Sequence, residues 1–109
     1  MRTAKVLFKN EEAGTLFQHN DGSFTFSYSD AWLTDIAKPG IALTIPKSQK
    51  EYQSPYLFPF FYNMLPEGAN KQALCSLLRI DPNDNFGLLM AAAGTDAIGA
   101  IRVVKLLTV

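Results

Sequence analysis

The sequence is poor in the side chains on which most metal and redox chemistry depends. Its 109 residues include one cysteine, Cys75, and one histidine, His19. A single cysteine cannot form an internal disulfide, which fits a reducing compartment. A zinc-type site needs three or four good ligands, and one histidine with one cysteine supplies too few. We therefore expect no metal site and no cofactor.

The chain also lacks an excess of either charge and lacks long hydrophobic runs. Ten Lys and Arg residues balance ten Asp and Glu residues, and no basic run occurs. Binding to a phosphate backbone depends on clustered, uncompensated cations, so we expect no direct contact with nucleic acid. No apolar stretch approaches the roughly 20 residues that span a bilayer, and the N-terminus has no apolar core of signal-peptide length. The sequence predicts a cytoplasmic protein without a membrane segment.

What the chain does contain is enough apolar material for one core. Hydrophobic residues make up 48% of it and aromatic residues 12%, a composition that excludes disorder. A chain of 109 residues matches one domain that needs no disulfide or metal to hold it together. We expect a single domain over residues 1–109.

Strand patterns occupy the first third of the chain. Ala4, Val6 and Phe8 alternate with Lys5, Leu7 and Lys9, which is the period of a strand. Residues 10–14 are expected to form a turn before a second strand over residues 15–19. Asn20-Asp21-Gly22 is a hairpin signal, because these residue types tolerate positive φ. The next strand places the aromatic side chains of residues 24, 26 and 28 on one face, and that face needs a cover.

The middle of the chain gives weaker signals. Asp30 is expected to cap a short turn that holds Trp32, which we assign to the core. Residues 41–45 are expected to form a further strand. The polar, unpatterned stretch from Lys47 to Ser54 predicts an exposed loop, whose role the sequence leaves open.

The second half predicts helices. Pro59 and Pro66 leave room only for a very short helix between them. A second helix is expected from residue 66 or 67 to about residue 79, with Leu74 and Leu78, and Ala73 and Leu77, as i,i+4 pairs on an inward face.

A third helix is expected to begin at Asp81-Pro82, a cap followed by proline, and to end at Gly94. Its apolar stripe contains Phe86, Leu89, Met90 and Ala93. Residues 97–107 predict a closing strand. The fold class is therefore α+β: a small antiparallel β-sheet with two to three helices packed on one side.

Catalytic interpretations find little support in these residues, and we expect no enzyme. His19 lies at a hairpin end and is expected to be a solvated strand residue. Glu67, Asp81 and Asp84 lie at helix starts, where negative charge is favourable. Cys75 is expected to be buried and inert. A small enzyme that uses Asp84 or Asp96 as general acid or base is an alternative that a deep pocket lined by those carboxylates would support.

The segment from Phe58 to Gly68 is the least ordinary part of the sequence. Large apolar residues dominate it, yet two prolines prevent a long helix, and Asn63 and Glu67-Gly68 interrupt it. Phe60, Phe61 and Leu65 are expected to divide between core and interface, with Tyr62, Asn63, Met64 and Glu67 facing outward.

Three motifs in order give the chain a family resemblance. Phe60 to Gly68 is similar to the "FF-x-N-L-L-P-E-G" signature of the N-terminal subdomain of HipA-type serine/threonine kinases. Residues 84–89 resemble its "D-x-F-x-L-L", and residues 94–100 resemble its "G-x-D-x-x-G-A". The likeness extends from about Lys5 to Val104. The polar stretch at residues 47–54 departs from the family pattern, being longer and more hydrophilic.

The resemblance implies a function in partnership with a kinase. No kinase lysine, catalytic loop or magnesium-binding motif occurs in the chain, so it resembles a stand-alone subdomain such as HipS, the antitoxin of HipBST-type toxin–antitoxin systems. The implied partner is a HipA- or HipT-type kinase, with a HipB-type helix-turn-helix protein reached through that kinase. The effect on the kinase stays open: the chain either neutralises the kinase or completes a split kinase.

The site residues follow from the same resemblance. The expected partner-binding residues are Phe60, Phe61, Tyr62, Asn63, Met64, Leu65, Pro66, Glu67 and Gly68. The expected structural motif consists of Asp84, Phe86, Gly94, Asp96 and Gly99. Direct contact with DNA is a further alternative, poorly supported by the neutral charge.

Overall fold

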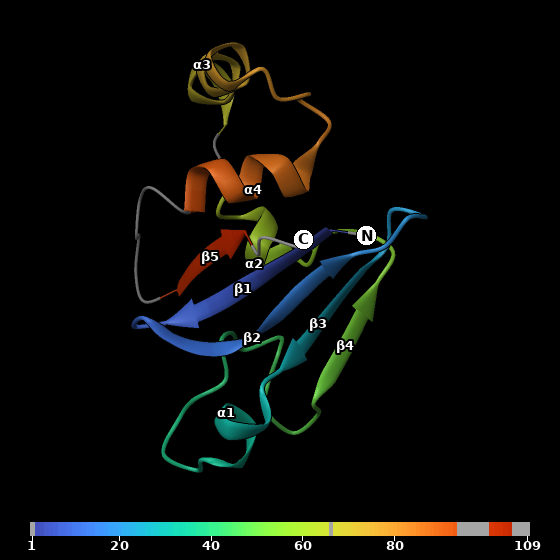
Figure 1. Ribbon diagram of the computed structural model, residues 1–109. Coiled ribbons are helices and arrows are strands. Elements are labelled where there is room, and N and C mark those ends of the chain that lie inside the picture. The colour runs from blue at the N-terminus through green and yellow to red at the C-terminus, as the bar shows by residue number, and fades with distance from the viewer. Residues whose placement is uncertain (1, 66, 94–100, 106–109) are drawn as a thin grey trace.

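The computed structural model describes residues 2–65, 67–93 and 101–105. It contains one five-stranded sheet in the order β4-β3-β2-β1-β5, in which every neighbouring pair is antiparallel. The strands are β1 (Arg2–Phe8), β2 (Glu11–Gln18), β3 (Phe24–Tyr28), β4 (Glu51–Ser54) and β5 (Ile101–Lys105), and the helices are α1 (Asp30–Thr34), α2 (Pro59–Tyr62), α3 (Gly68–Leu78) and α4 (Asn85–Ala93). Figure 1 shows α2 and α4 above the sheet and α1 at its opposite end. The α+β prediction is confirmed.

The first hairpin is tighter than the sequence predicts. Lys9 and Asn10 both have positive φ, 49° and 69°, and Phe8 pairs with Glu11, which describes a two-residue turn. The expected turn over residues 10–14 is therefore wrong, because residues 11–14 already belong to β2. Gly14 lies in that strand beside an irregularity of register, and a Cβ there would lie 2.4 Å from the Ser27 carbonyl oxygen.

The core lies on the aromatic face of β3. Phe24, Phe26 and Tyr28 are all buried, as their alternation predicts. The Phe26 ring lies 6.1 Å from the Phe61 ring of α2, and the Phe24 ring lies 6.5 Å from the Phe86 ring of α4. The two helices are therefore the cover that this face requires.

The segment between β3 and β4 differs from prediction in three places. Ser29, not Asp30, caps α1, since its hydroxyl accepts a hydrogen bond from the Trp32 amide. Trp32 is buried, as predicted, and its ring N–H donates to the Pro39 carbonyl at 2.9 Å. Residues 41–45 form no strand but one isolated bridge. Residues 51–54 form the edge strand β4, so the predicted loop over residues 47–54 is wrong in its second half.

Side-chain hydrogen bonds hold residues 41–45 in place of a strand ladder. The buried Tyr28 hydroxyl donates to the Ile45 carbonyl and accepts from the Ile41 amide at 3.0 Å. The Lys47 ammonium donates to the carbonyls of Asp35 and Lys38 at 2.6 and 2.8 Å. The Ile41 amide and the Ile45 carbonyl thus share one side-chain partner in place of a strand ladder, while Lys47 binds the preceding loop.

The helices occur near their predicted places, with two corrections. Pro59 is the first residue of α2, as expected. The predicted inward face of α3 is wrong, because that helix, described in full, has no buried residue. The third helix begins at Asn85 rather than at Asp81-Pro82. Gly94 and residues 97–100, where this helix and the closing strand were expected to end and begin, lie outside the described residues.

Candidate partner-binding surface

The short helix α2 is anchored to the sheet by one ring. Phe61 has no exposed surface and packs among three other phenylalanines. Its ring centroid lies 5.2 Å from that of Phe60, 6.1 Å from that of Phe26 and 6.3 Å from that of Phe58. Such edge-on and tilted aromatic contacts fix the orientation of a ring as well as burying it. The orientation of the residues that follow is therefore set by the core.

The expected partner-binding residues divide into three groups around this anchor. Phe61 belongs to the core, while Phe60, Met64 and Leu65 are half-buried and pack against it. The exposed residues are Tyr62, Asn63, Glu67 and Gly68. Pro66 lies outside the described residues. The outward orientation expected for Met64 is thus only partly correct, because its side chain also contacts the core.

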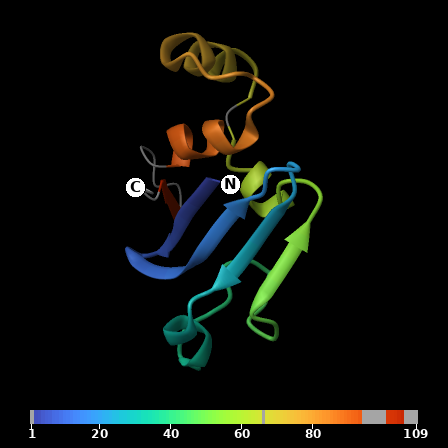
Figure 2. The ribbon, with the colours of Figure 1, turned by 45° about the vertical axis from the view of Figure 1, so that its right-hand side comes forward.

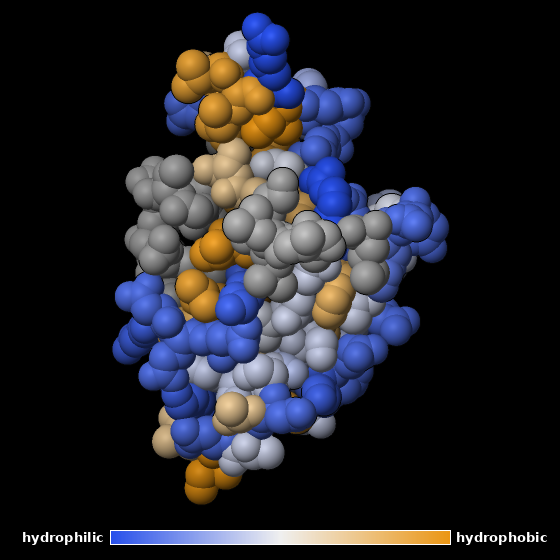
Figure 3. All heavy atoms as spheres, viewed as in Figure 1, coloured by the Kyte–Doolittle hydropathy of each residue, from blue (hydrophilic) through white to orange (hydrophobic). Residues whose placement is uncertain are grey.

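Helix α3 continues this surface from the same segment. Gly68, with φ of 57°, is its first residue, and Glu67 stands at the N-cap without a side-chain cap hydrogen bond. Leu77 is 79% exposed and Leu78 is 49% exposed. Cys75, expected to be buried, is half-buried. Figure 3 shows hydrophobic side chains gathered over α3 at the top of the molecule.

Helix α4, in contrast, has a side-chain cap at its N-terminus. The Asp84 carboxylate accepts from the Gly87 amide at 3.0 Å and from both terminal nitrogens of Arg2 at 2.8 and 3.1 Å. The Arg2 guanidinium also lies 4.7 Å from the centre of the buried Phe86 ring. Partial burial acts to raise the pKa of Asp84, but these hydrogen bonds and the charge of Arg2 outweigh it and hold the pKa below its usual range.

The predicted structural motif is therefore divided. Asp84 and Phe86 join β1 to α4, which agrees with a structural role. Gly87 permits that cap, because a Cβ there would lie 2.5 Å from an Asp84 oxygen. Gly94, Asp96 and Gly99 lie outside the described residues.

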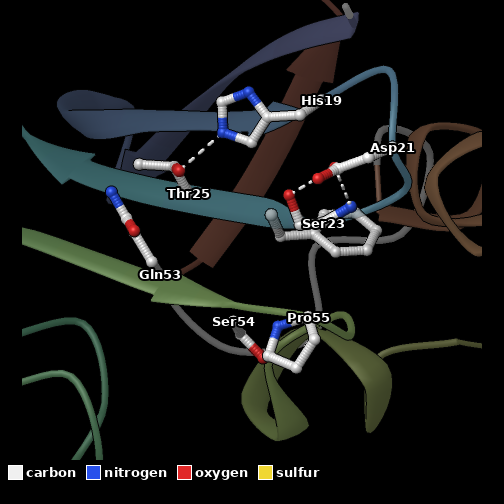
Figure 4. Close-up of a pocket in the computed structure, with 8 residues that line it drawn as sticks. His19, Asp21, Ser23, Thr25, Gln53, Ser54 and Pro55 are labelled. Atoms are coloured by element: carbon white, nitrogen blue, oxygen red, sulfur yellow. Dashed lines mark hydrogen bonds between the residues drawn. The ribbon is translucent and has the colours of Figure 1, made fainter.

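A shallow groove lies at the β2–β3 turn, beside the end of β4. It encloses about 370 Å³ and is lined by His19, Asp21, Ser23, Phe24, Thr25, Gln53, Ser54 and Pro55. Figure 4 shows the hydrogen bonds between the His19 ring and the Thr25 hydroxyl, which is 2.7 Å long, and between Asp21 and Ser23. The Ser23 hydroxyl and amide lower the pKa of Asp21. These polar groups satisfy one another within the turn.

Other candidate sites find no support in the part of the chain that the structure describes. Within residues 2–65, 67–93 and 101–105, no three His, Cys, Asp or Glu side chains gather as metal ligands would. No helix in those ranges has both the length and the hydropathy to cross a bilayer.

Sequence reasoning missed two parts of the exposed surface. Tyr56 is 78% exposed and directly precedes the buried pair Leu57 and Phe58. The available signal for this exposure was that the aromatic residue Tyr56 follows Pro55 and belongs to no period-2 pattern. Leu77 and Leu78 were assigned inward because helical spacing cannot show which of two elements covers an apolar stripe.

Comparison with known proteins identifies relatives of two sizes. The HipA N-terminal domain family matches residues 4–104. An uncharacterized protein of Haemophilus influenzae is 32% identical over 103 residues, which make up 94% of this chain and 92% of that protein. Two proteins of Sinorhizobium fredii, described as putative kinases Y4mE and Y4dM, are 28% and 30% identical, and this chain spans only 24% and 25% of their length.

A solved structure from the same family is similar to this chain. It is described as the N-terminal domain of HipA toxin, has 28% sequence identity, and superposes with a TM-score of 0.72 over 100% of this chain and 96% of that one.

Proposed function

The chain belongs to the HipA N-terminal domain family, and we propose that it is a non-catalytic module that binds and neutralises a separately encoded HipA- or HipT-type serine/threonine kinase in the cytoplasm. The sizes of its relatives support this proposal. The same domain occurs as about a quarter of two putative kinases and as nearly the whole of a small protein. A domain found both attached to a kinase and apart from one is suited to binding the remainder of that kinase.

The observation that carries the proposal is the presentation of the signature segment. Phe61 locks α2 against the sheet, and the same short helix leaves Tyr62 53% exposed at its end. Asn63 and Glu67 follow it on the surface. Because the backbone under Tyr62 is already ordered, docking costs little backbone entropy there, and buried tyrosines are common anchors of interfaces.

A second function rests on the same relatives. In it the chain is the detached N-terminal lobe of a split HipA kinase, required for its activity or for its assembly with a HipB-type DNA-binding protein. The large relatives favour this alternative, because in them the domain and the rest of a putative kinase share one polypeptide. The two functions use one docking surface and differ in the sign of the effect.

One experiment tests both functions. A HipA-type kinase that lacks its own N-terminal domain is mixed with increasing amounts of this chain, and binding and autophosphorylation are measured together. Binding with falling activity supports neutralisation, and co-expression should then rescue growth. Binding with rising activity supports the split kinase. Absence of binding to every such kinase of the source genome contradicts both.

A variant locates the contact. Tyr62→Ala should weaken binding by at least about 30-fold, the effect of an interface anchor worth about 2 kcal/mol. Ile36→Ala is the matched control, because Ile36 is fully exposed and lies just after α1, at the end of the sheet opposite α2 (Figure 1). Met64→Asp is less informative, since Met64 also packs against the core.

A further inference from the structure

Helix α3 carries leucines that the described part of the domain leaves exposed. In Figures 1 and 2, α4 lies between α3 and the sheet, so α3 is the outermost layer. None of its eleven residues is buried. Ala73 and Leu77, and Leu74 and Leu78, lie one turn apart and form one stripe along the helix. This stripe of four residues is called the α3 stripe below.

Helix α3 is also too short to be stable by itself. Isolated helices below about 12–15 residues are marginal in water, and most helices in proteins are stabilised by packing of an apolar face. Its N-terminus has no side-chain cap, and its C-cap residue, Arg79, takes the left-handed conformation at φ of 54°, which is unfavourable for a residue other than glycine. The neighbouring α4, with two residues fewer, has the Asp84 cap and buried Phe86, Leu88 and Leu89. Helix α3 has no buried residue of this kind, so a contact from outside the described part of the domain would stabilise it.

We propose that the α3 stripe docks into an apolar groove with an acidic rim on the kinase, and that this contact stabilises α3 as a helix. The inference rests on the proposed function, since it names the second part of the same docking surface. The chain is continuous between the parts: α2 ends at Tyr62 and α3 begins at Gly68. The acidic rim follows from charge, because Lys71 and Arg79 are the only charged residues between Gly68 and Ile80.

The size of α3 favours a kinase over a second copy of this chain. Eleven residues make a helix about 16 Å long and about 10 Å wide. One face of such a rod falls far below the roughly 800 Å² per partner of a standard interface. A symmetric pairing of two α3 helices would therefore bury too little surface, whereas docking together with the exposed residues of α2 extends the contact across both elements.

The test compares two variants of the full chain against a HipA-type kinase without its own N-terminal domain. Leu77→Gln with Leu78→Gln keeps helix propensity and charge but removes the two most exposed leucines of the α3 stripe. It should weaken kinase binding by at least about 30-fold, the value of roughly 2 kcal/mol of lost apolar burial. Ser76→Gln places the same residue type on the opposite face of the same turn and should bind like the natural chain. Thermal unfolding of both variants should match that of the natural chain, since the replaced leucines are exposed.

Hydrogen exchange supplies a second readout that does not depend on a substitution. On kinase binding, the amides of residues 72–78 should slow by at least about tenfold, while those of residues 89–92 in α4 should already be slow in the free chain. Unchanged exchange in α3, or equal binding by the leucine variant, overturns the proposal while the docking function stands. A natural chain that binds no such kinase defeats both. Dimerisation of the free chain through Leu77 and Leu78, or binding of anionic vesicles by the natural chain but not the leucine variant, would assign the stripe to another partner and also overturn it.

Discussion

The ion pair that joins the first strand to α4 gives the sharpest test of the structure. The Asp84 carboxylate receives three hydrogen bonds, two from Arg2 and one from the Gly87 amide. Loss of a helix cap costs about 1 kcal/mol. The ion pair adds less than about 1 kcal/mol, because the side chain of Arg2 is 45% exposed and solvent screens such a pair. Asp84→Ala should therefore lower the free energy of unfolding by about 1.5–2 kcal/mol.

Two further substitutions separate the cap from the ion pair. Asparagine caps helices about as well as aspartate, so Asp84→Asn should keep the Gly87 contact, lose the charge, and cost below about 1 kcal/mol. Asp81→Asn is the control, because the Asp81 carboxylate accepts a local hydrogen bond from the Asn83 amide at 2.9 Å that asparagine can also accept, and it should change stability little. The assay is urea unfolding, monitored by the fluorescence of Trp32, which lies in the core.

The effect should depend on pH in a defined direction. The pKa of Asp84 is lower in the folded chain than its usual value, whereas an unfolded aspartate titrates near about 3.9. The charged carboxylate therefore contributes its full stabilisation above that pH, and the contribution is lost as the pH falls through the folded-state pKa. The difference between the natural chain and Asp84→Asn should shrink below about pH 4. A difference that stays constant down to pH 2, or Asp81→Asn costing as much as Asp84→Ala, would refute this account of the cap.

Three other substitutions test the core, a loop and a close approach, each by urea unfolding. Phe61→Ala should cost about 3–5 kcal/mol, because it empties a fully buried ring site among three other phenylalanines; a cost below about 1 kcal/mol would show that α2 is not anchored there. Tyr28→Phe should cost about 1–3 kcal/mol and speed hydrogen exchange of the Ile41 amide, since that amide and the Ile45 carbonyl lose their shared hydroxyl; unchanged exchange would contradict the pinned loop. Gly87→Ala should cost about 1–3 kcal/mol, as its Cβ meets the capping carboxylate at 2.5 Å, and a neutral effect would mean that the cap shifts freely.

Local patterns in the sequence were sufficient for some elements because the cause of each element is local. The alternation of residues 24, 26 and 28 identified the buried face of β3, and Pro59 marked the start of α2. The Asn20-Asp21-Gly22 turn was also correct, with Gly22 at φ of 90°. In each case neighbouring residues determine the conformation, so no tertiary information was needed.

Other elements failed because distant partners decide them. Residues 41–45 have strand composition, yet they are not a strand of the described sheet, and the Tyr28 hydroxyl pairs with the Ile41 amide and the Ile45 carbonyl instead. The polar residues of β4 have no strand pattern, but they complete the open edge of β3. The ion pair of Asp84 is made with Arg2, 82 positions away in sequence. The two members of each of these contacts are too far apart in sequence for a short local pattern to contain both.

The candidate surface combines a rigid part with a part that lacks internal support, and this difference bears on how docking proceeds. The backbone at Tyr62 is held by the buried Phe61 ring and by the hydrogen bond from the Tyr62 amide to the Phe58 carbonyl, so it can meet a partner without rearrangement. None of the four residues of the α3 stripe is buried in the same way, so the cost of ordering them must be offset by the contact that they make. If binding began at α3, substitutions of Leu77 would slow association. If it begins at Tyr62, they should leave the association rate nearly unchanged and speed dissociation, as is usual for mutants of one interface. The geometry favours the second order, because only the α2 part of the surface is held in place before the partner arrives.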